Sequence, residues 1–382
     1  MRAVLFQSDE TGGLKASQTY SEEDLTSQFQ LALCFSSKKS LESQNIFQLV
    51  HEKFPGAEVV ICSTAGEICQ NEILDDSLVV AALSFKKTKI TTAWIRTREF
   101  KNSFEMGSGL VEKLPKEGLK YIMLISDGSL VNGSELVKGV NHACENDVII
   151  TGGLAGDGNE FRSTLIGLNA PAESGLIVAI GFYGNDIFIG HGTKGGWENF
   201  GPERMVTRSR GNILYEINGK SALELYKRYL GEESSNLPSS AFLFPLSLKI
   251  QGKNSLLVRT ILSINEAEGS MTFAGDVPEG SMVRFMRSNA DKLTEAASEA
   301  AKKSRLFNDA KPAFSLIVSC VGRRIALGYR AEEEVEAINE ELNGGTVITG
   351  FYSYGEIAPF DDTSGCELHN QTISVTSFYE NE

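Results

Sequence analysis

Acidic residues directly follow glycine in three short loops of this sequence, Gly66-Glu67, Gly156-Asp157 and Gly355-Glu356. Each pair comes after an apolar run typical of a β-strand. A carboxylate in such a loop can face a ligand, because glycine lets another backbone or a ligand approach closely. The three acids therefore suit the ammonium group of an amine-bearing ligand. Turn formation and capping of neighbouring amides explain any single Gly-acid pair equally well.

Other side chains near these loops complete a candidate ligand site. Arg323 carries a guanidinium group that could hold a ligand carboxylate bidentately. Tyr352 and Tyr354 offer apolar faces with polar tips. Together with the acids, this set predicts a ligand that carries both an amine and a carboxylate.

Cysteine offers a different chemistry, nucleophilic catalysis. The six cysteines are scattered, with no CxxC pair and no spacing typical of a zinc site. We expect reduced and mostly buried thiols, since a free thiol in an apolar run behaves as a small hydrophobe. A hydrolase-like enzyme that uses Cys62 or Cys320 as nucleophile remains an alternative, although the sequence places no base beside either. The expectation is that the protein is not an enzyme.

Histidine raises the question of a metal or haem. None of the four histidines has a partner at the i+3 or i+4 spacing of a helical metal site, and HExxH is absent. His191 stands between Gly190 and Gly192 after a predicted strand, so the glycines would leave room around its ring. His191 is therefore a candidate axial haem ligand, beside its interpretation as a loop histidine without a role. We expect no other cofactor and no metal.

The glycine-rich stretch 152–158 invites comparison with a nucleotide-binding loop. Its glycines do not have the GxGxxG spacing, and no helical pattern follows them. The sequence also lacks the lysine and hydroxyl pair of a phosphate-binding loop. Nucleotide binding is therefore not the favoured interpretation.

The elements that must position these residues occur in three similar copies. Each copy reads as a strand, a helix, a second strand that ends in a Gly-acid loop, and a third strand. The copies start near Leu31, Tyr121 and Phe314. A strand–helix–strand unit normally joins parallel strands, and such sheets bind ligands at the carboxyl ends of their strands. Three loops in matching positions therefore predict one shared pocket.

The stretch between the second and third copies has a different character. It predicts a strand over 210–217, a helix over 221–230, a polar loop over 231–240 and then short alternating strands, the first over 255–265. The whole chain is expected to be an α/β protein with mixed β-sheets, flanking helices and repeated strand–helix–strand–loop–strand units. We expect two domains, over residues 28–220 and 221–382.

Composition limits the classes of partner. The 382 residues include 36 Lys or Arg and 50 Asp or Glu, for a net charge of −14. This charge argues against nucleic-acid binding, which needs clustered basic residues. No apolar run approaches the length of a membrane span, and no export signal begins the sequence. A cytoplasmic protein that contacts no membrane is expected.

The motifs also resemble a known family. The stretches 62–68 and 152–158 are similar to motifs of the N-terminal FIST domain, and 350–359 is similar to the C-terminal FIST domain. Residues 319–323 and 369–372 support the resemblance, which runs in the family's order from about residue 28 onward.

This resemblance implies a bacterial sensory module that binds a small ligand, an amino acid or a derivative. The alternative within the family is a haem-based nitric oxide sensor that regulates a histidine kinase. The candidate ligand-binding residues are Cys62, Ser63, Thr64, Glu67, Gly153, Asp157, Cys320, Arg323, Tyr352, Tyr354, Glu356, His369 and Asn370.

The last predicted strand, 374–378, leaves little sequence for an effector domain. We therefore expect the signal to pass to a separate protein. The resemblance names a histidine kinase and a cyclic-nucleotide signalling enzyme as candidate partners.

Overall fold

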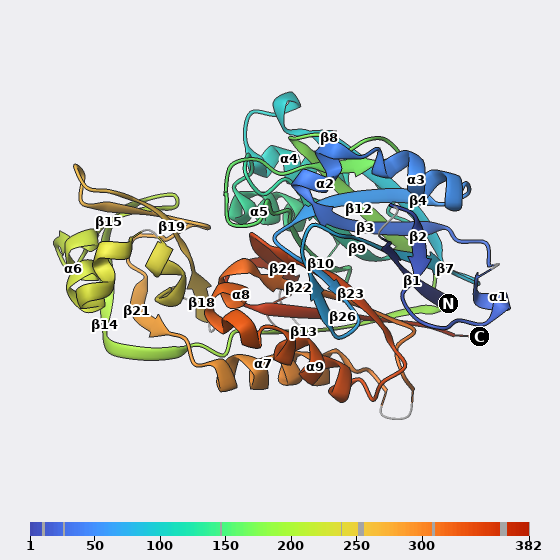
Figure 1. Cartoon of the computed structure of the whole chain (residues 1–382). Helices are drawn as coiled ribbons and strands as arrows, with labels where there is room; N and C mark the ends of the chain where they lie inside the picture. The colour runs from blue at the N-terminus through green and yellow to red at the C-terminus, as the bar shows by residue number, and fades with distance from the viewer. Residues whose placement is uncertain are drawn as a thin grey trace.

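The structure is a computed structural model that describes residues 1–9, 12–25, 27–145, 147–237, 239–250, 256–307, 310–359 and 365–381. The larger body contains three sheets, and a smaller inserted domain lies at its side (Figure 1). The inserted domain consists of residues 198–287 and interrupts the third of three similar units. The predicted α/β class with mixed sheets is confirmed.

Each unit begins its sheet with two parallel strands joined by helical segments. The pairs are β3 (Leu31–Ser37) with β4 (Glu58–Thr64), β9 (Leu119–Ser126) with β10 (Ile149–Leu154), and β22 (Phe314–Cys320) with β23 (Val347–Ser353). These strands are almost entirely buried, as their continuous apolar sequences predict for strands covered on both faces. The predicted parallel crossovers are therefore present in all three copies.

Two antiparallel strands complete the other side of each sheet. The third strand of the unit pairs with the first: β7 (Leu78–Ser84), β12 (Leu176–Tyr183) and β26 (Ile373–Glu380). An edge strand that precedes the unit then pairs with the third: β1 (Arg2–Ser8), β8 (Lys89–Arg96) and β13 (Ile187–Lys194). A short strand β2 (Leu14–Ala16) extends the first sheet.

The three units also exchange strands. The strand after each Gly-acid loop leaves its own unit and pairs with the second parallel strand of another: β5 (Glu67–Cys69) with β23, β11 (Ile166–Leu168) with β4, and β24 (Gly355–Pro359) with β10. Two further strands, β6 (Glu72–Leu74) and β25 (Cys366–His369), extend these additions. Each unit therefore donates one strand and receives one, so the three sheets are bound into one body.

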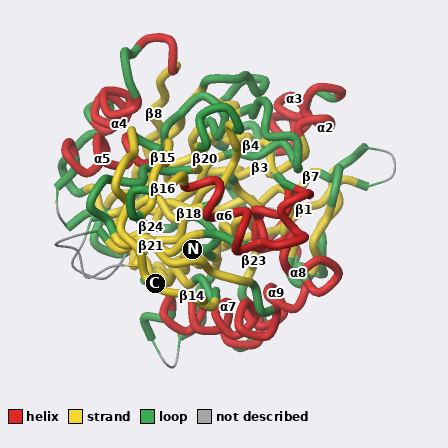
Figure 2. Tube along the Cα trace, turned by 90° about the vertical axis from the view of Figure 1, so that its left-hand side faces the viewer, coloured by secondary structure: helices red, strands yellow, loops and turns green. Residues whose placement is uncertain are grey.

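Helices cover the outside of the sheets, while the inner faces of all three sheets meet in one apolar core. Figure 2 shows three groups of helices around the central strands. The groups are α2 (Lys38–Ser43) with α3 (Ile46–Lys53), α4 (Ser103–Val111) with α5 (Gly133–Ala143), and α7 (Ala290–Ser304) with α8 (Val321–Leu327) and α9 (Glu332–Glu341). The remaining short helical segments are α1 (Glu22–Leu25), η1 (Thr97–Glu99) and η4 (Gly328–Arg330).

The inserted domain has its own sheet and core. Its strands are β14 (Glu198–Arg210), β15 (Ile213–Ile217), β16 (Lys220–Ser221), β17 (Leu246–Lys249), β18 (Leu256–Arg259), β19 (Ile261–Asn265), β20 (Ser270–Phe273) and β21 (Met282–Arg287). Its helical segments are α6 (Ala222–Leu230), η2 (Gly231–Asn236) and η3 (Ser239–Leu243). Of the strand predicted over 255–265, residue 255 lies outside the described residues, as does residue 382.

The predicted domain division after residue 220 falls within β16, between Lys220 and Ser221, inside the inserted domain. Strands from both sides of this point also share sheets, since β24 pairs with β10 and β5 pairs with β23. The two-domain division stays a prediction.

Candidate functional site

The three loops that end the second parallel strands meet at one end of the core. They are joined in a cycle of backbone hydrogen bonds: Ala65 N to Tyr352 O (2.9 Å), Tyr354 N to Leu154 O (3.2 Å) and Gly156 N to Ser63 O (3.0 Å). The cycle follows from the exchange of strands, because each loop crosses from one sheet to the next. The repeated loops of the sequence are therefore neighbours in space.

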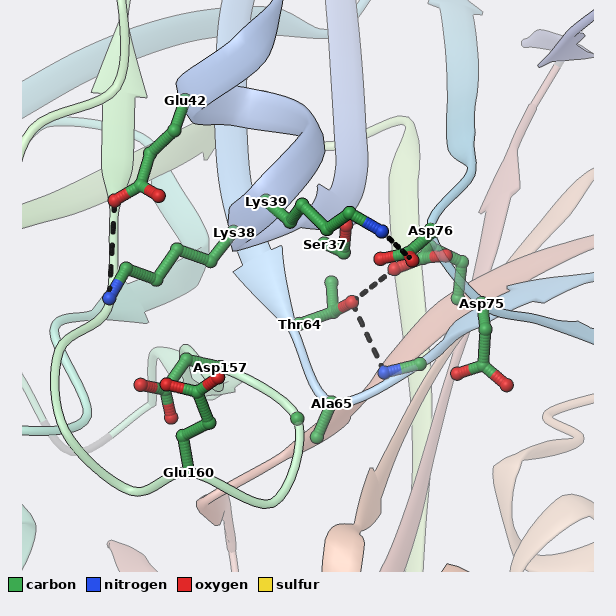
Figure 3. Close-up of a pocket in the computed structure, with 13 residues that line it drawn as sticks. Ser37, Lys38, Lys39, Glu42, Thr64, Ala65, Asp75, Asp76, Asp157 and Glu160 are labelled. Carbon is green, nitrogen blue, oxygen red and sulfur yellow. Dashed lines mark hydrogen bonds and ion pairs between the residues drawn. The ribbon is translucent and has the colours of Figure 1, made fainter.

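A cavity of about 240 Å³ opens beside two of these loops (Figure 3). Its walls come from the start of α2, the loop after β4, the turn before β7 and the loop after β10. It is lined by six carboxylates and two lysines together with small residues: Glu42, Glu67, Asp75, Asp76, Asp157, Glu160, Lys38, Lys39, Ser37, Thr64, Ala65, Gly66 and Gly158. We call it the charged cavity.

Glu67 forms the floor of the charged cavity and is fully buried. Thr64 Oγ1 donates to Glu67 Oε1 at 2.5 Å, and the backbone N–H of Ser77 donates to Oε2 at 3.2 Å. Burial nevertheless raises the pKa of Glu67 to about 7. Gly66 beside it has φ +132°, and a Cβ there would strike the guanidinium of Arg324, so the position needs glycine.

Asp157 forms the opposite wall. Its Oδ2 accepts from the backbone N–H groups of Arg162 (3.0 Å) and Ser163 (2.9 Å), and its Oδ1 accepts from the hydroxyl of Tyr354. These bonds hold the carboxylate in one orientation, with 7% of the residue exposed. Two acids from the sequence-predicted set, Glu67 and Asp157, thus line one cavity, together with Thr64.

The lysines of the cavity were not among the residues singled out from the sequence. Lys38 Nζ donates to Ser163 Oγ at 2.5 Å and lies 4.0 Å from Glu42 Oε1. Lys39 Nζ pairs with Asp76 Oδ2 at 2.8 Å. Both lysines follow β3 directly, at the carboxyl end of a strand in the parallel pair, and this position was the signal that could have identified them.

Glu356 does not line the charged cavity, contrary to the shared pocket expected for the three acids. It is fully buried in β24, where its Oε1 accepts from Ser353 Oγ (2.7 Å). Its Oε2 accepts from the backbone N–H (3.2 Å) and hydroxyl (2.8 Å) of Thr372. Burial raises the pKa of Glu356 to about 8. Because Glu356 lies outside the charged cavity and protein groups bind both of its oxygens, the structure places it in an internal contact instead of the expected ammonium contact.

Arg323 is likewise corrected from a ligand contact to a core residue. It is fully buried and pairs with Glu334, with Nε and Nη2 at 3.0 and 2.8 Å from Oε2. Its remaining donors reach the backbone carbonyls of Gly195 and Leu293. Tyr352 points to the same place, since its hydroxyl donates to Glu334 Oε1 at 2.8 Å.

The next residue, Arg324, reaches the edge of the charged cavity instead. Its Nη1 donates to the backbone carbonyl of Ala65 at 2.8 Å. Both terminal nitrogens also bind Asp75, at 2.8 and 2.7 Å. Because Asp75 and Ala65 line the cavity, Arg324 fixes its rim from the third unit.

The predicted residues Cys62, Ser63, Gly153 and Cys320 serve packing. Ser63 Oγ donates to the carbonyl of Gly156 at 2.7 Å, which helps to join two of the loops. Gly153 pairs with Glu356 across β10 and β24. Both cysteines are buried, which raises the pKa of their thiols. The expectation of reduced, mostly buried cysteines agrees with the structure, in which all six are free thiols.

His369 and Asn370 lie in a buried turn between β25 and β26, away from the charged cavity. His369 Nε2 lies 3.1 Å from the carbonyl oxygen of Ala358, and burial lowers the pKa of the ring to about 4. The side-chain oxygen and nitrogen of Asn370 are buried without a hydrogen-bond partner among the described residues.

His191 lies within β13 rather than after it, so the expected loop position is wrong. A Cβ at Gly190 or Gly192 would strike backbone carbonyl oxygens of α7, so the helix fills the room that these glycines leave. By strand alternation His191 shares a face with Ile187 and Ile189, which pack in the central core. These surroundings do not fit an axial haem ligand.

The described part of the chain contains neither a metal-binding cluster nor a membrane-spanning helix. No group of three or more His, Cys, Asp or Glu side chains is placed there to hold a metal ion. No helix in the same residues is long and apolar enough to cross a membrane.

Comparison with known proteins identifies relatives of unassigned function. An uncharacterized protein of Mycobacterium tuberculosis (strain ATCC 25618 / H37Rv) is 22% identical over 192 residues, which cover 48% of this chain and 49% of that protein. One from Mycobacterium bovis (strain ATCC BAA-935 / AF2122/97) is 26% identical over 186 residues, covering 46% and 47%. The chain thus spans about half the length of the curated relatives it matches.

Among solved structures, a cyanuric acid hydrolase aligns with a TM-score of 0.32 and 10% identity, covering 98% of this chain and 99% of the hydrolase. Cyanuric acid hydrolase from A. caulinodans aligns with a TM-score of 0.32 and 8% identity, covering 100% and 99%. Similarity at this level indicates neither a shared fold nor a shared activity.

Family models give the clearest result. The FIST N domain matches residues 30–220 and the FIST C domain matches residues 222–359, so the resemblance seen in the loop motifs extends over most of the chain. The chain therefore belongs to the FIST family.

Proposed function

We propose that this protein is a sensory module whose charged cavity binds a small amine-bearing ligand, an amino acid or a derivative. The observation that carries the proposal is the lining of that cavity, where six carboxylates surround about 240 Å³ with only two lysines. Glu67 and Asp157 approach it from different units, as expected for a site at the ends of parallel strands. Membership in a family identified with sensory domains supports the same function.

Charge selects the class of ligand. The excess of carboxylates favours an ammonium group, because charge-assisted hydrogen bonds are stronger than neutral ones. Lys38, whose Nζ is held by the hydroxyl of Ser163, would receive a ligand carboxylate. The volume lies just below the usual range for drug-sized ligands and suits a molecule of amino-acid size. It is too small for haem, which argues against the haem-based alternative.

Binding, rather than catalysis, is the proposed activity. A nucleophilic cysteine needs a stabilised thiolate, whereas burial disfavours the charged form of Cys62 and Cys320. The signal would pass to a separate protein, with a histidine kinase or a cyclic-nucleotide signalling enzyme as the candidate partner. Ligand contacts in the charged cavity would link the loops of two units, and Arg324 and Tyr354 would extend the link to the third.

Differential scanning fluorimetry against two groups of small molecules tests the ligand class. Lysine, arginine, glycine and simple diamines form the first group, and acetate and succinate form the second. A ligand selective for the native state stabilises it by about 2.7 kcal/mol at 100 times its Kd. We expect at least one amine to raise the melting temperature and neither carboxylate to do so. Stabilisation by the carboxylates alone would contradict the proposal.

A further inference from the structure

A second cavity of about 490 Å³ lies between the larger body and the inserted domain. One wall comes from the loops after β9 and β10 and from Tyr354, and the other comes from β19, β20 and the turn before β15. Among the described residues that line it, none is Asp, Glu, Lys, Arg or His. In a chain with a net charge of −14, this lining differs sharply from that of the charged cavity. We call it the neutral cavity.

The wall on the larger body is mostly apolar and aromatic, with Ser129 and Asn132 as its polar side chains. Leu130 is 59% exposed there, and across the cavity Leu262 is 39% exposed. Exposed large aliphatic side chains on both sides of one hollow mark a surface suited to an apolar ligand. Phe161 stacks on Tyr354 with ring centroids 4.4 Å apart, which fixes both aromatic rings in this wall.

Phe161 also has an uncommon backbone conformation, with φ +53°. This left-handed region is costly for an aromatic residue and persists only where the surroundings enforce it. Here its backbone N–H donates to the hydroxyl of Tyr354 at 3.1 Å, and its ring is held between Tyr354 and Phe242. The strained backbone and the two stacking contacts therefore hold the ring of Phe161 in position.

The wall on the inserted domain is uncharged and combines apolar side chains with polar ones. Asn212 uses its Nδ2 to bind the carbonyl of Phe273 at 2.8 Å, which leaves Oδ1 to face a ligand. The hydroxyls of Thr272 and Ser263 also line the cavity, and they make no hydrogen bond to protein within the described residues. These groups can donate to and accept from a ligand without any ionic contact.

We infer that the neutral cavity is a second binding site, which takes an uncharged small molecule with a flat ring and hydrogen-bonding groups on one edge. The ring would lie among Leu130, Leu262 and the edges of the stacked Phe161 and Tyr354 rings, and its polar edge would face Asn212 and Thr272. Its volume lies within the usual range for small-molecule sites. An ion that entered the neutral cavity would lose hydration and find no opposite charge in the lining, so charged analogues should bind there more weakly than neutral ones. This inference does not depend on what binds in the charged cavity.

Isothermal titration with neutral ring probes tests the inference. Indole, benzamide and phenol serve as probes, and indole-3-acetate serves as the charged analogue of indole. We expect at least one neutral probe to bind the full chain, and indole-3-acetate to bind at least about tenfold more weakly than indole. Absence of binding by all three neutral probes at about 10 mM, a concentration above the Kd of even a millimolar ligand, would overturn the inference.

Two variants locate the binding. Leu262→Glu places a carboxylate in the neutral cavity at a partly exposed position, so the fold should tolerate it. Leu256→Glu is the control, because Leu256 is similarly exposed at 44% in the same domain but does not line the cavity. The first should weaken probe binding by about tenfold or more and the second should leave it unchanged. Equal effects of the two variants would contradict the site.

A second copy of the chain could cover the neutral cavity instead of a small molecule. Light scattering, which measures the molar mass in solution, distinguishes the two. The small-molecule assignment predicts the same molar mass for the wild type and Leu262→Glu. A wild-type oligomer that Leu262→Glu alone dissociates would overturn that assignment in favour of an interface.

Discussion

The hydroxyl of Tyr354 donates a hydrogen bond to the carboxylate of Asp157, across the junction of two units. The same oxygen accepts from the backbone N–H groups of Asp157 and Phe161, both at 3.1 Å. Asp157 lines the charged cavity, whereas the ring of Tyr354 lines the neutral cavity. A single side chain thus separates and connects the two cavities.

Replacing Tyr354 by phenylalanine should destabilise the protein and weaken ligand binding in the charged cavity. The ring remains, but Asp157 loses a donor and two backbone N–H groups lose their acceptor. A buried group without its partner costs about 1–3 kcal/mol. Urea unfolding measures the loss, and titration with an amine measures affinity. Tyr329→Phe is the control, because Tyr329 is 98% exposed and should change neither quantity. Equal stability of the two variants would contradict this role for Tyr354.

Glu356 should make the folded protein less stable as the pH rises. Burial raises its pKa to about 8 in the folded state, above the ordinary value of 4.5. Between about pH 4.5 and 8 the folded state therefore keeps a proton that the unfolded state has released. The contribution of this group to the free energy of unfolding is fully present below pH 4.5 and is lost as the pH rises through this range. Glu67 acts in the same direction, with a pKa of about 7.

Glu356→Gln tests two statements about Glu356, that its raised pKa makes stability depend on pH and that it does not contact the ligand. The amide can place its oxygen against Thr372 and donate to Ser353, so the hydrogen bonds are kept without a charge. We expect unfolding measured from pH 5 to 9 to show a weaker pH dependence than in wild type, with unchanged affinity for amines. A loss of affinity in a variant of unchanged stability would restore the ligand contact expected from the sequence.

The pair formed by Arg323 and Glu334 should matter for stability rather than binding. Arg323→Met leaves the buried carboxylate of Glu334 without an opposite charge, and breaking a buried pair costs about 3–5 kcal/mol. The matched control is Arg330→Met, since Arg330 pairs with Glu333 and Asp291 at the surface, where such pairs contribute about 0–1 kcal/mol. Denaturant unfolding compares the two. A similar small loss in both would show that Arg323 does not anchor the core through Glu334.

Much of the fold was predictable from the sequence, because apolar runs such as 31–37 and 314–320 become buried strands. The helix predicted over 221–230 corresponds to α6. The exchanged strands were not predicted. β5 and β11 have only three residues each, and their partners lie far away in the sequence, so no local pattern reveals them.

The candidate site was predictable only in part. The Gly-acid motif identified Glu67 and Asp157, but the same motif at Glu356 leads to a buried internal contact. The residues after the first strand differ between the units. Lys38 and Lys39 follow β3 in the first unit, whereas Val321 and Gly322 follow β22 in the third. Arg323 and Arg324 are adjacent on α8, and only tertiary packing directs one into the core and the other to the cavity rim.

The central claim is that carboxylates of the charged cavity bind a ligand ammonium, and Asp157→Asn tests it most directly. The amide oxygen can keep both backbone bonds, and the proton of Tyr354 can turn to the carbonyl oxygen of Gly158, 3.2 Å away. Glu336→Gln on the exposed face of α9 is the control for loss of one negative charge.

The measurement is isothermal titration of wild type and both variants with the amine that stabilises the protein best. A charge-assisted hydrogen bond contributes roughly 1.5–3 kcal/mol, so Asp157→Asn should weaken binding about 10- to 150-fold. Glu336→Gln should leave the Kd unchanged. Equal affinity of wild type and a folded Asp157→Asn variant would contradict the proposed site.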